Sequence, residues 1–155
     1  MPRIGAPSRY KTGYRNEPYV VTPPWTKITA YDLNTGKIKW QEALGEDAVA
    51  EKEGAKNTGI EEGGERRGII VTSTGLLFVN CKDGKLRAFD AENGKVLWSI
   101  DMPTGSEGIP AMYQVDGRQY LVVDTSTPVI FGRSPSNTQT IAPTFRGYVV
   151  YALPK

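Results

Sequence analysis

Hydrophobic and polar residues alternate along much of the chain in short runs, a pattern typical of β-strands. Leu86 and Ala88 alternate with Arg87 and Phe89, which is the period of two expected of a strand. No segment carries a sustained apolar stripe with the period of 3.6 residues that an amphipathic helix requires. The pattern therefore predicts an all-β chain, with a single short helix expected between residues 46 and 53.

The predicted strands follow one another with tight turns between them. Residues 68–100 contain four apolar or alternating runs, separated by Thr74-Gly75, by Asp83-Gly84 and by the segment 90–94. Residues 109–124 begin the same pattern again, with Asp116-Gly117 at the turn. Short turns of this kind join antiparallel neighbours, so the sequence predicts four-stranded antiparallel sheets.

One strand–turn–strand element occurs twice. Residues 28–40 match residues 86–98 with the same alanine, aspartate, glycine, lysine and tryptophan, and a truncated third copy at 149–153 has Tyr151 in the place of Phe89. The aspartate can accept hydrogen bonds from N–H groups just downstream, and the glycine can adopt a positive φ. The final tryptophan, Trp40 or Trp98, is suited to packing against a neighbouring sheet.

Four-stranded units that repeat along a chain predict a β-propeller, and the repeat spacing is lengthened by a polar insertion at 44–67. A β-sandwich also joins hairpins in series, but it does not require the same tryptophan-ended element each time. The predicted fold is a segment of about two and a half antiparallel blades. We expect an extension or linker at 1–22 and a partial propeller at 23–155, with a blade hairpin at 26–42, a full blade at 68–101 and a three-stranded blade at 108–154.

Composition excludes several kinds of function. Charges are balanced, with 19 basic and 17 acidic residues, which gives no indication of a nucleic-acid partner. The sequence has no histidine, which excludes Ser-His-Asp and Cys-His nucleophiles. Cys81 lies in an apolar run and is expected to be a small buried residue. No apolar run is long enough for a membrane helix, and the first residues lack the apolar core of a signal peptide.

The repeated element Ala30 to Trp40 resembles the tryptophan docking motif of dehydrogenases that use pyrroloquinoline quinone (PQQ). Further matches follow in family order and resemble the last blades of the membrane glucose dehydrogenase branch. They are the segment 23–32, which begins Pro23-Pro24-Trp25, the segment 83–89, the segments 102–105 and 109–123, and the segment 148–154. Trp40 and Trp98 are then expected to pack between blades.

The resemblance implies an eight-bladed, periplasmic or extracytoplasmic propeller that oxidises an alcohol or a sugar by hydride transfer to PQQ, assisted by Ca²⁺. The family's metal ligands and its catalytic aspartate belong to earlier blades, so no catalytic or metal-binding residue is assigned here. Asp83 falls where the glucose branch has an aspartate near the cofactor, and is the one expected cofactor-binding residue. Turn chemistry alone also explains Asp83, as the first residue of an Asp-Gly turn.

The sequence departs from the glucose branch between residues 124 and 140, where those enzymes have a glycine-rich segment with a histidine close to the quinone. Here the segment has no histidine, and Arg133 is the residue that could supply charge in its place, or else is a solvated loop residue. The departure leaves open either another substrate branch or altered quinone binding.

Three functions are compatible with the sequence. The first is the C-terminal part of a quinoprotein dehydrogenase, completed by blades from another polypeptide or from copies of itself, because propeller blades need neighbours on both faces. The second is a non-catalytic propeller that serves as a protein-interaction scaffold in the bacterial envelope. The third is an engineered or self-assembling propeller fragment.

Overall fold

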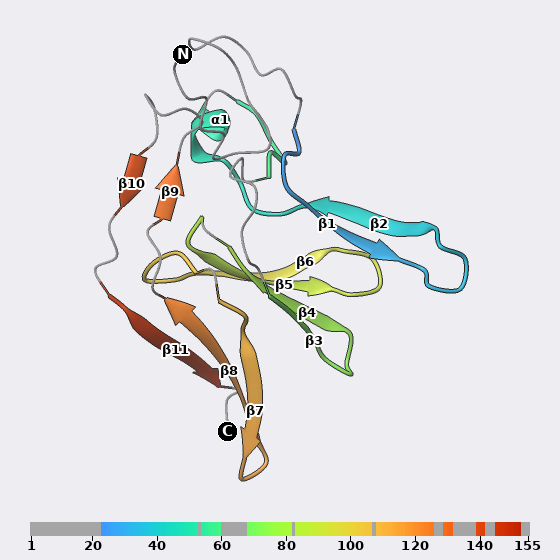
Figure 1. Cartoon of the computed structure of the whole chain (residues 1–155), viewed down its shortest axis with the longest axis vertical. Helices are drawn as coiled ribbons and strands as arrows, with labels where there is room; N and C mark the ends of the chain where they lie inside the picture. The colour runs from blue at the N-terminus through green and yellow to red at the C-terminus, as the bar shows by residue number, and fades with distance from the viewer. Residues whose placement is uncertain are drawn as a thin grey trace, which may run out of the picture.

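The computed structural model is built almost entirely of antiparallel β-sheet, as predicted (Figure 1). It describes residues 23–52, 54–59, 68–81, 83–106, 108–125, 129–131, 139–141 and 145–152. The expected extension at 1–22 and Arg133 lie outside these residues.

A four-stranded sheet forms the centre of the chain. Its strands are paired in chain order, each antiparallel to the next. They are β3 (Ile69–Val71), β4 (Leu76–Asn80), β5 (Lys85–Asp90) and β6 (Val96–Asp101). Gly75 and Gly84 make the first two turns with φ values of 82° and 77°, a conformation that side chains with a Cβ rarely adopt.

A separate hairpin consists of β1 (Lys27–Tyr31) and β2 (Ile38–Ala43) and has the geometry of β5 and β6. Both hairpins have an irregularity at the same place, after Ala30 in the first and after Ala88 in the second. The sequence repeat therefore corresponds to a structural repeat that includes its local distortion.

The third sheet has the order β11-β8-β7. Its strands are β7 (Ala111–Val115), β8 (Arg118–Thr125) and β11 (Gly147–Ala152). Two further strands, β9 (Val129–Phe131) and β10 (Gln139–Ile141), pair with each other. The sequence did not predict this hairpin, because residues 124–140 have no clear alternation.

The predicted short helix is present as α1 (Ala48–Lys52), in the connection that follows β2. The Asp47 carboxylate caps it by accepting a hydrogen bond of 2.9 Å from the backbone N–H of Ala50. Within the described residues, no helix has the length and apolar character needed to cross a membrane.

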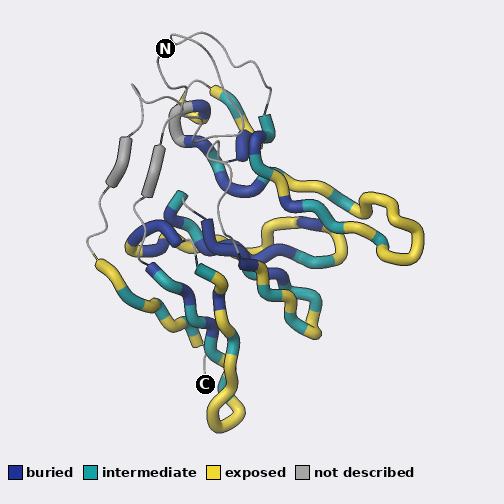
Figure 2. The backbone as a smooth tube through the Cα atoms, in the orientation of Figure 1, coloured by how far each residue is buried: buried dark blue, intermediate teal, exposed yellow. Residues whose placement is uncertain are grey.

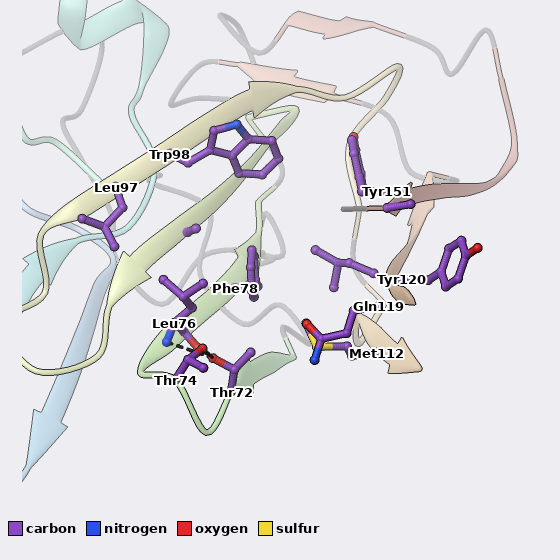
Figure 3. A pocket seen from close by; sticks show the side chains of 13 residues that line it. Thr72, Thr74, Leu76, Phe78, Leu97, Trp98, Met112, Gln119, Tyr120 and Tyr151 are labelled. Atoms are coloured by element: carbon purple, nitrogen blue, oxygen red, sulfur yellow. Dashed lines mark hydrogen bonds between the residues drawn. The ribbon is translucent and has the colours of Figure 1, made fainter. Parts of the chain in front are cut away.

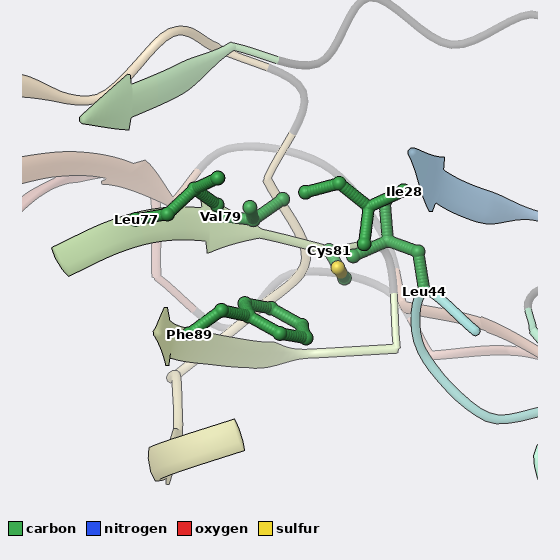
Figure 4. Close-up of a cluster of buried hydrophobic side chains, with 6 residues drawn as sticks. All are labelled: Ile28, Leu44, Leu77, Val79, Cys81 and Phe89. Atoms are coloured by element: carbon green, nitrogen blue, oxygen red, sulfur yellow. The ribbon is translucent and has the colours of Figure 1, made fainter. Parts of the chain in front are cut away.

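The two middle strands of the central sheet, β4 and β5, are largely buried on both faces, whereas β6 is exposed along its length (Figure 2). One face packs against the β1–β2 hairpin through Ile28, Leu44, Leu77, Val79, Cys81 and Phe89 (Figure 4). The other packs against the third sheet through Leu86, Met102, Leu121 and Val123. Cys81 is fully buried, as expected. Side chains that alternate along the sequence therefore lie in two separate packing layers, one on each face of the central sheet.

Trp40 connects the first two sheets, which confirms its expected packing role. Its indole Nε1 donates a hydrogen bond of 3.0 Å to the main-chain carbonyl of Ala91, and its ring lies over Gly94. Trp98 occupies the equivalent place on β6 and contacts Tyr151 of the third sheet edge-on, with ring centroids 6.0 Å apart. Successive sheets are therefore joined by the same tryptophan position.

Candidate functional site

The buried polar residues of the described chain gather at one end of the sheets. They lie in the connections that follow β2 and β6 and at the neighbouring ends of β4, β5 and β8 (Figure 1). The set comprises Asp47, Thr58, Asn80, Arg87, Thr104, Ser106 and Thr125. Burying polar groups costs free energy unless they are hydrogen-bonded, so their concentration at one end marks this region as the candidate site.

Asp83, the expected cofactor-binding residue, lies in the turn between β4 and β5 and is held by four protein donors. The Arg87 guanidinium donates Nη1 to Oδ1 at 3.1 Å and Nη2 to Oδ2 at 2.5 Å. The backbone N–H of Lys85 donates to Oδ1 at 3.1 Å, and that of Glu46 to Oδ2 at 3.4 Å. Both carboxylate oxygens are thus engaged within the protein.

The Asp83–Arg87 pair is buried, with side-chain exposures of 6% and 9%. Burial lowers the pKa of the Arg87 guanidinium, but its hydrogen bonds with Asp83 and the charge of that carboxylate outweigh burial, and the pKa is raised overall. Removing one partner of such a pair leaves an uncompensated buried charge. Asp83 therefore holds Arg87 in place and ties the turn to the connection at Glu46.

That connection is ordered by its own hydrogen bonds. The Glu46 carboxylate accepts hydrogen bonds from the backbone N–H of Thr58 at 3.0 Å and from the Thr58 hydroxyl at 2.8 Å. The backbone N–H of Asp47 donates to the same hydroxyl oxygen at 2.7 Å, and that of Trp25 to the Thr58 carbonyl at 2.8 Å. Thr58 thus closes the described part of the polar insertion onto the start of β1.

A second polar cluster joins the central sheet to the third sheet. The Asn80 amide nitrogen donates to Ser106 Oγ and, at 3.0 Å, to the Gly108 carbonyl. Ser106 Oγ and the backbone N–H of Gly108 donate to Asp124 Oδ1 at 2.5 Å and 2.9 Å. A Cβ on Gly108 would collide with that same oxygen, so the close approach requires glycine.

Asn80 Oδ1 is the one buried side-chain polar atom of the described chain without a hydrogen-bond partner in the structure. Asn80 is only 1% exposed, so this oxygen can accept a hydrogen bond from a group enclosed at the junction of the two sheets. No group of three or more potential metal ligands occurs among the described residues.

An apolar cleft of about 550 Å³ lies between the central and third sheets (Figure 3). Phe78, Trp98, Met112 and Tyr151 contribute side chains, and the polar side chains at its edge are uncharged. Tyr151 is one of the few titratable side chains in the lining of the cleft, and burial raises the pKa of its phenol. The cleft has the character of a packing interface rather than of a reaction site.

The sequence singled out Asp83 as a candidate but did not single out the residues that surround it. Arg87 carried a signal, because the alternation of β5 puts it on the same buried face as Phe89, where a lone cation needs an anion. Asn80 also carried a signal, because it is the polar residue at the end of an otherwise apolar strand. Nothing in the sequence places Ser106 and Asp124 beside Asn80, because that contact depends on how two sheets approach each other.

Residues 6–121 match the family model described as glucose/ethanol/alcohol dehydrogenase, beta-propeller domain, named PQQ. The chain is 34% identical over 137 residues to the glycerol dehydrogenase large subunit of Gluconobacter thailandicus, covering 85% of this chain and 17% of the relative. It is 32% identical over 116 residues to the quinoprotein glucose dehydrogenase of Escherichia coli, covering 71% and 14%. The chain therefore spans less than a fifth of the length of these relatives.

Among solved structures, the quinohemoprotein alcohol dehydrogenase of Comamonas testosteroni aligns with a TM-score of 0.48 and 26% identity. The alignment covers 72% of this chain and 14% of that one.

Proposed function

The chain belongs to the β-propeller family of PQQ-dependent glucose, ethanol and alcohol dehydrogenases, and from this premise we propose that it forms the C-terminal part of a quinoprotein that oxidises an alcohol or a sugar. The match to the family over residues 6–121 is the observation that carries the proposal. Relatives named for glycerol, glucose and 1-butanol support the substrate class. By family, we place the protein in the periplasm or at the membrane.

In the complete enzyme, PQQ with its Ca²⁺ would accept the hydride from the substrate's alcohol carbon. PQQ is a flat tricarboxylate, so its site needs cationic or N–H donors and flat walls. The described residues do not fit this requirement by themselves: the Arg87 cation is paired with Asp83, and the unpartnered buried atom, Asn80 Oδ1, is an acceptor. We therefore propose that residues outside the described part provide most of the cofactor's contacts.

For Asp83 we propose a positioning role at the cofactor-facing end of the blade. Its carboxylate fixes the Arg87 guanidinium and, through the Glu46 N–H, the connection that follows β2. Glu46 in turn holds Thr58. One buried ion pair thereby sets the shape of this part of the site, and a change at Asp83 is expected to alter the affinity for PQQ without removing a direct contact.

The proposal can be tested on the tagged protein isolated with the polypeptides that accompany it. After incubation with PQQ and Ca²⁺, we expect quinone absorbance to co-elute with the protein in gel filtration. We also expect glycerol, glucose or 1-butanol to support reduction of an artificial electron acceptor, and a chelator to abolish this activity. A folded assembly that retains no quinone and oxidises none of these substrates would refute the proposal.

A non-catalytic propeller that organises other envelope proteins is the second candidate. The absence of histidine from the sequence favours it, as does the saturation of Asp83 by protein donors. An assembly that forms stably but carries no quinone is the result expected of such a scaffold, so the same experiment separates the two functions.

A further inference from the structure

Asn93 and Gly94 are the only asparagine–glycine pair of the sequence, and they lie in the turn between β5 and β6. An asparagine side chain that precedes glycine is the one most open to deamidation, because glycine has no Cβ to hinder attack by its own backbone nitrogen. Asn93 is exposed, whereas Gly94 is buried. A reactive pair therefore lies in a well-defined turn, and the structure of that turn determines when it can react.

Each group that takes part in deamidation is held by a hydrogen bond in this turn. The Gly94 N–H, which supplies the nucleophile, donates to the Asp90 carbonyl at 2.8 Å. The Asn93 amide nitrogen, which is the leaving group, donates to Asp90 Oδ2 at 2.8 Å. Asn93 Oδ1 accepts a hydrogen bond of 2.9 Å from the backbone N–H of Lys95. The turn must open before the nitrogen can reach the amide carbon.

Trp40 of the β1–β2 hairpin covers the same turn. A Cβ on Gly94 would stand 2.6 Å from Cε3 of the indole, so the ring leaves the glycine no room to move toward it. The indole N–H donates to the Ala91 carbonyl at 3.0 Å, which ties the ring to the turn. The docked β1–β2 hairpin therefore opposes the opening that deamidation needs.

We propose that Asn93 is a deamidation site controlled by the docking of the β1–β2 hairpin, and that its reaction makes undocking permanent. When the hairpin moves away and the turn opens, the Gly94 nitrogen bonds to Asn93 Cγ. The Cγ–Nδ2 bond breaks, and the amide leaves as ammonia with the proton from the Gly94 nitrogen. Water then opens the cyclic imide at either carbonyl and gives aspartate or isoaspartate, with no oxidation or reduction.

Both products disturb the turn. An aspartate at this position brings a carboxylate against Asp90 Oδ2, which accepts a hydrogen bond from the Asn93 amide, and the two like charges repel. An isoaspartate adds the side-chain methylene to the main chain just before Gly94 and displaces the glycine from under the Trp40 ring. The reaction thus converts a transient opening into a lasting one.

The matching turn of the β1–β2 hairpin supplies an unreactive replacement for the asparagine. Thr35 stands there in the place of Asn93. Its hydroxyl oxygen accepts a hydrogen bond from the backbone N–H of Lys37, as Asn93 Oδ1 does from Lys95. Asn93→Thr therefore removes the amide while keeping a residue that this kind of turn accommodates.

Mass spectrometry of the peptide that carries Asn93 measures the reaction in the tagged protein isolated with its accompanying polypeptides. During incubation at mildly alkaline pH, we expect deamidation to be at least about tenfold slower in the folded protein than in urea, because opening the turn breaks three hydrogen bonds. The pairs Asp83-Gly84 and Asp116-Gly117 have no amide to lose and give no mass change. Equal rates in the two conditions would overturn the proposal.

Trp40→Ala tests the control by docking, and Leu121→Ala is the matched control. Leu121 packs on the other face of the central sheet, so its truncation removes core contacts without touching the turn. Below the urea concentration at which either variant unfolds, we expect Trp40→Ala to accelerate deamidation at Asn93 and Leu121→Ala to leave its rate unchanged. Equal acceleration in both variants, or none in Trp40→Ala, would contradict control by the hairpin.

Prolonged incubation tests the consequence of the reaction and does not depend on how Trp40→Ala folds. We expect the midpoint of urea unfolding to fall as the unsubstituted protein deamidates, and to stay constant in Asn93→Thr. A protein that is deamidated at Asn93 but keeps its midpoint would refute the permanent undocking. These measurements require no quinone, so their outcome is independent of the test for PQQ activity.

Discussion

The indole nitrogen of Trp40 lies 3.0 Å from the main-chain carbonyl oxygen of Ala91, 51 residues further along the chain. This one hydrogen bond joins the β1–β2 hairpin to the central sheet, beside the apolar layer formed by Ile28, Leu77 and Phe89. Because Trp40 is the last residue of the repeated element, this hydrogen bond shows how the sequence repeat takes part in the packing of one sheet on the next.

Replacing Trp40 with phenylalanine keeps an aromatic ring but removes the N–H donor. We expect the free energy of unfolding in urea to fall by about 1 kcal/mol, because the Ala91 carbonyl loses its partner. Trp98→Phe is the control, since Trp98 meets Tyr151 through an edge-on ring contact that phenylalanine can also make, and it should have a smaller effect. Equal losses in the two variants would show that the hydrogen bond contributes nothing specific.

Gly94→Ala should destabilise the chain more than Gly75→Ala does. Both glycines have similar positive φ values, 79° and 82°, so each substitution carries a comparable backbone cost of about 1 to 2 kcal/mol. Only at Gly94 does the new Cβ collide with Trp40, which adds about 1 to 3 kcal/mol of overpacking. Urea unfolding of both variants measures the difference, and no difference would mean that Trp40 can shift without cost.

Asp83→Ala should cost about 3 to 5 kcal/mol, because it leaves the Arg87 guanidinium buried without its counter-charge. Urea unfolding measures the loss. Asp101→Asn breaks the exposed ion pair with Lys85 and should leave the unfolding midpoint unchanged. The double variant Asp83→Ala/Arg87→Leu should recover part of the lost stability, and a further loss instead would show that the buried charge is not the cause.

In the PQQ-loaded assembly, the conservative variant Asp83→Asn tests the positioning role separately from stability. We expect weaker PQQ retention, measured by equilibrium dialysis at a temperature where the variant is folded. Unchanged retention would restrict Asp83 to a structural role in its turn.

Asp124→Ala should loosen the junction between the central and third sheets. It removes the acceptor for the Ser106 hydroxyl and for the Gly108 N–H, and an unsatisfied buried donor costs about 1 to 3 kcal/mol. Hydrogen exchange of the Gly108 amide should accelerate well before global unfolding. An unchanged exchange rate would mean that other contacts hold this amide.

Alkaline pH should weaken the packing around Tyr151. Burial raises the pKa of its phenol, so the folded chain keeps this proton to a higher pH than the unfolded chain does. The stabilising contribution is complete below the unfolded pKa of about 10 and is lost as pH rises beyond it. Tyr151→Phe should therefore lose less stability than the unsubstituted protein above about pH 10. Parallel pH profiles would contradict this assignment.

Much of the fold could be predicted because local chemistry determines it. The alternation of Leu86 and Ala88 with Arg87 and Phe89 correctly assigned these side chains to two faces, and both faces are buried. The hairpin β9–β10 was missed because its segment has no period of two.

The candidate site was less predictable, because its contacts join segments that are distant in the sequence. Asp83 was singled out by its place in the family resemblance, but its hydrogen bond with Glu46 joins it to the irregular sequence of the polar insertion. The Asn80–Ser106–Asp124 cluster depends on the approach of two sheets, and no spacing rule connects those positions.

The acceptor for Trp40 is a backbone carbonyl, and this has a consequence for substitution. Every residue type presents the same carbonyl, so the hydrogen bond does not require alanine at position 91. At this contact, the residue types that matter are the tryptophan and the glycine beneath its ring, not the residue that supplies the carbonyl. A substitution at the accepting position therefore leaves this link between the two sheets intact.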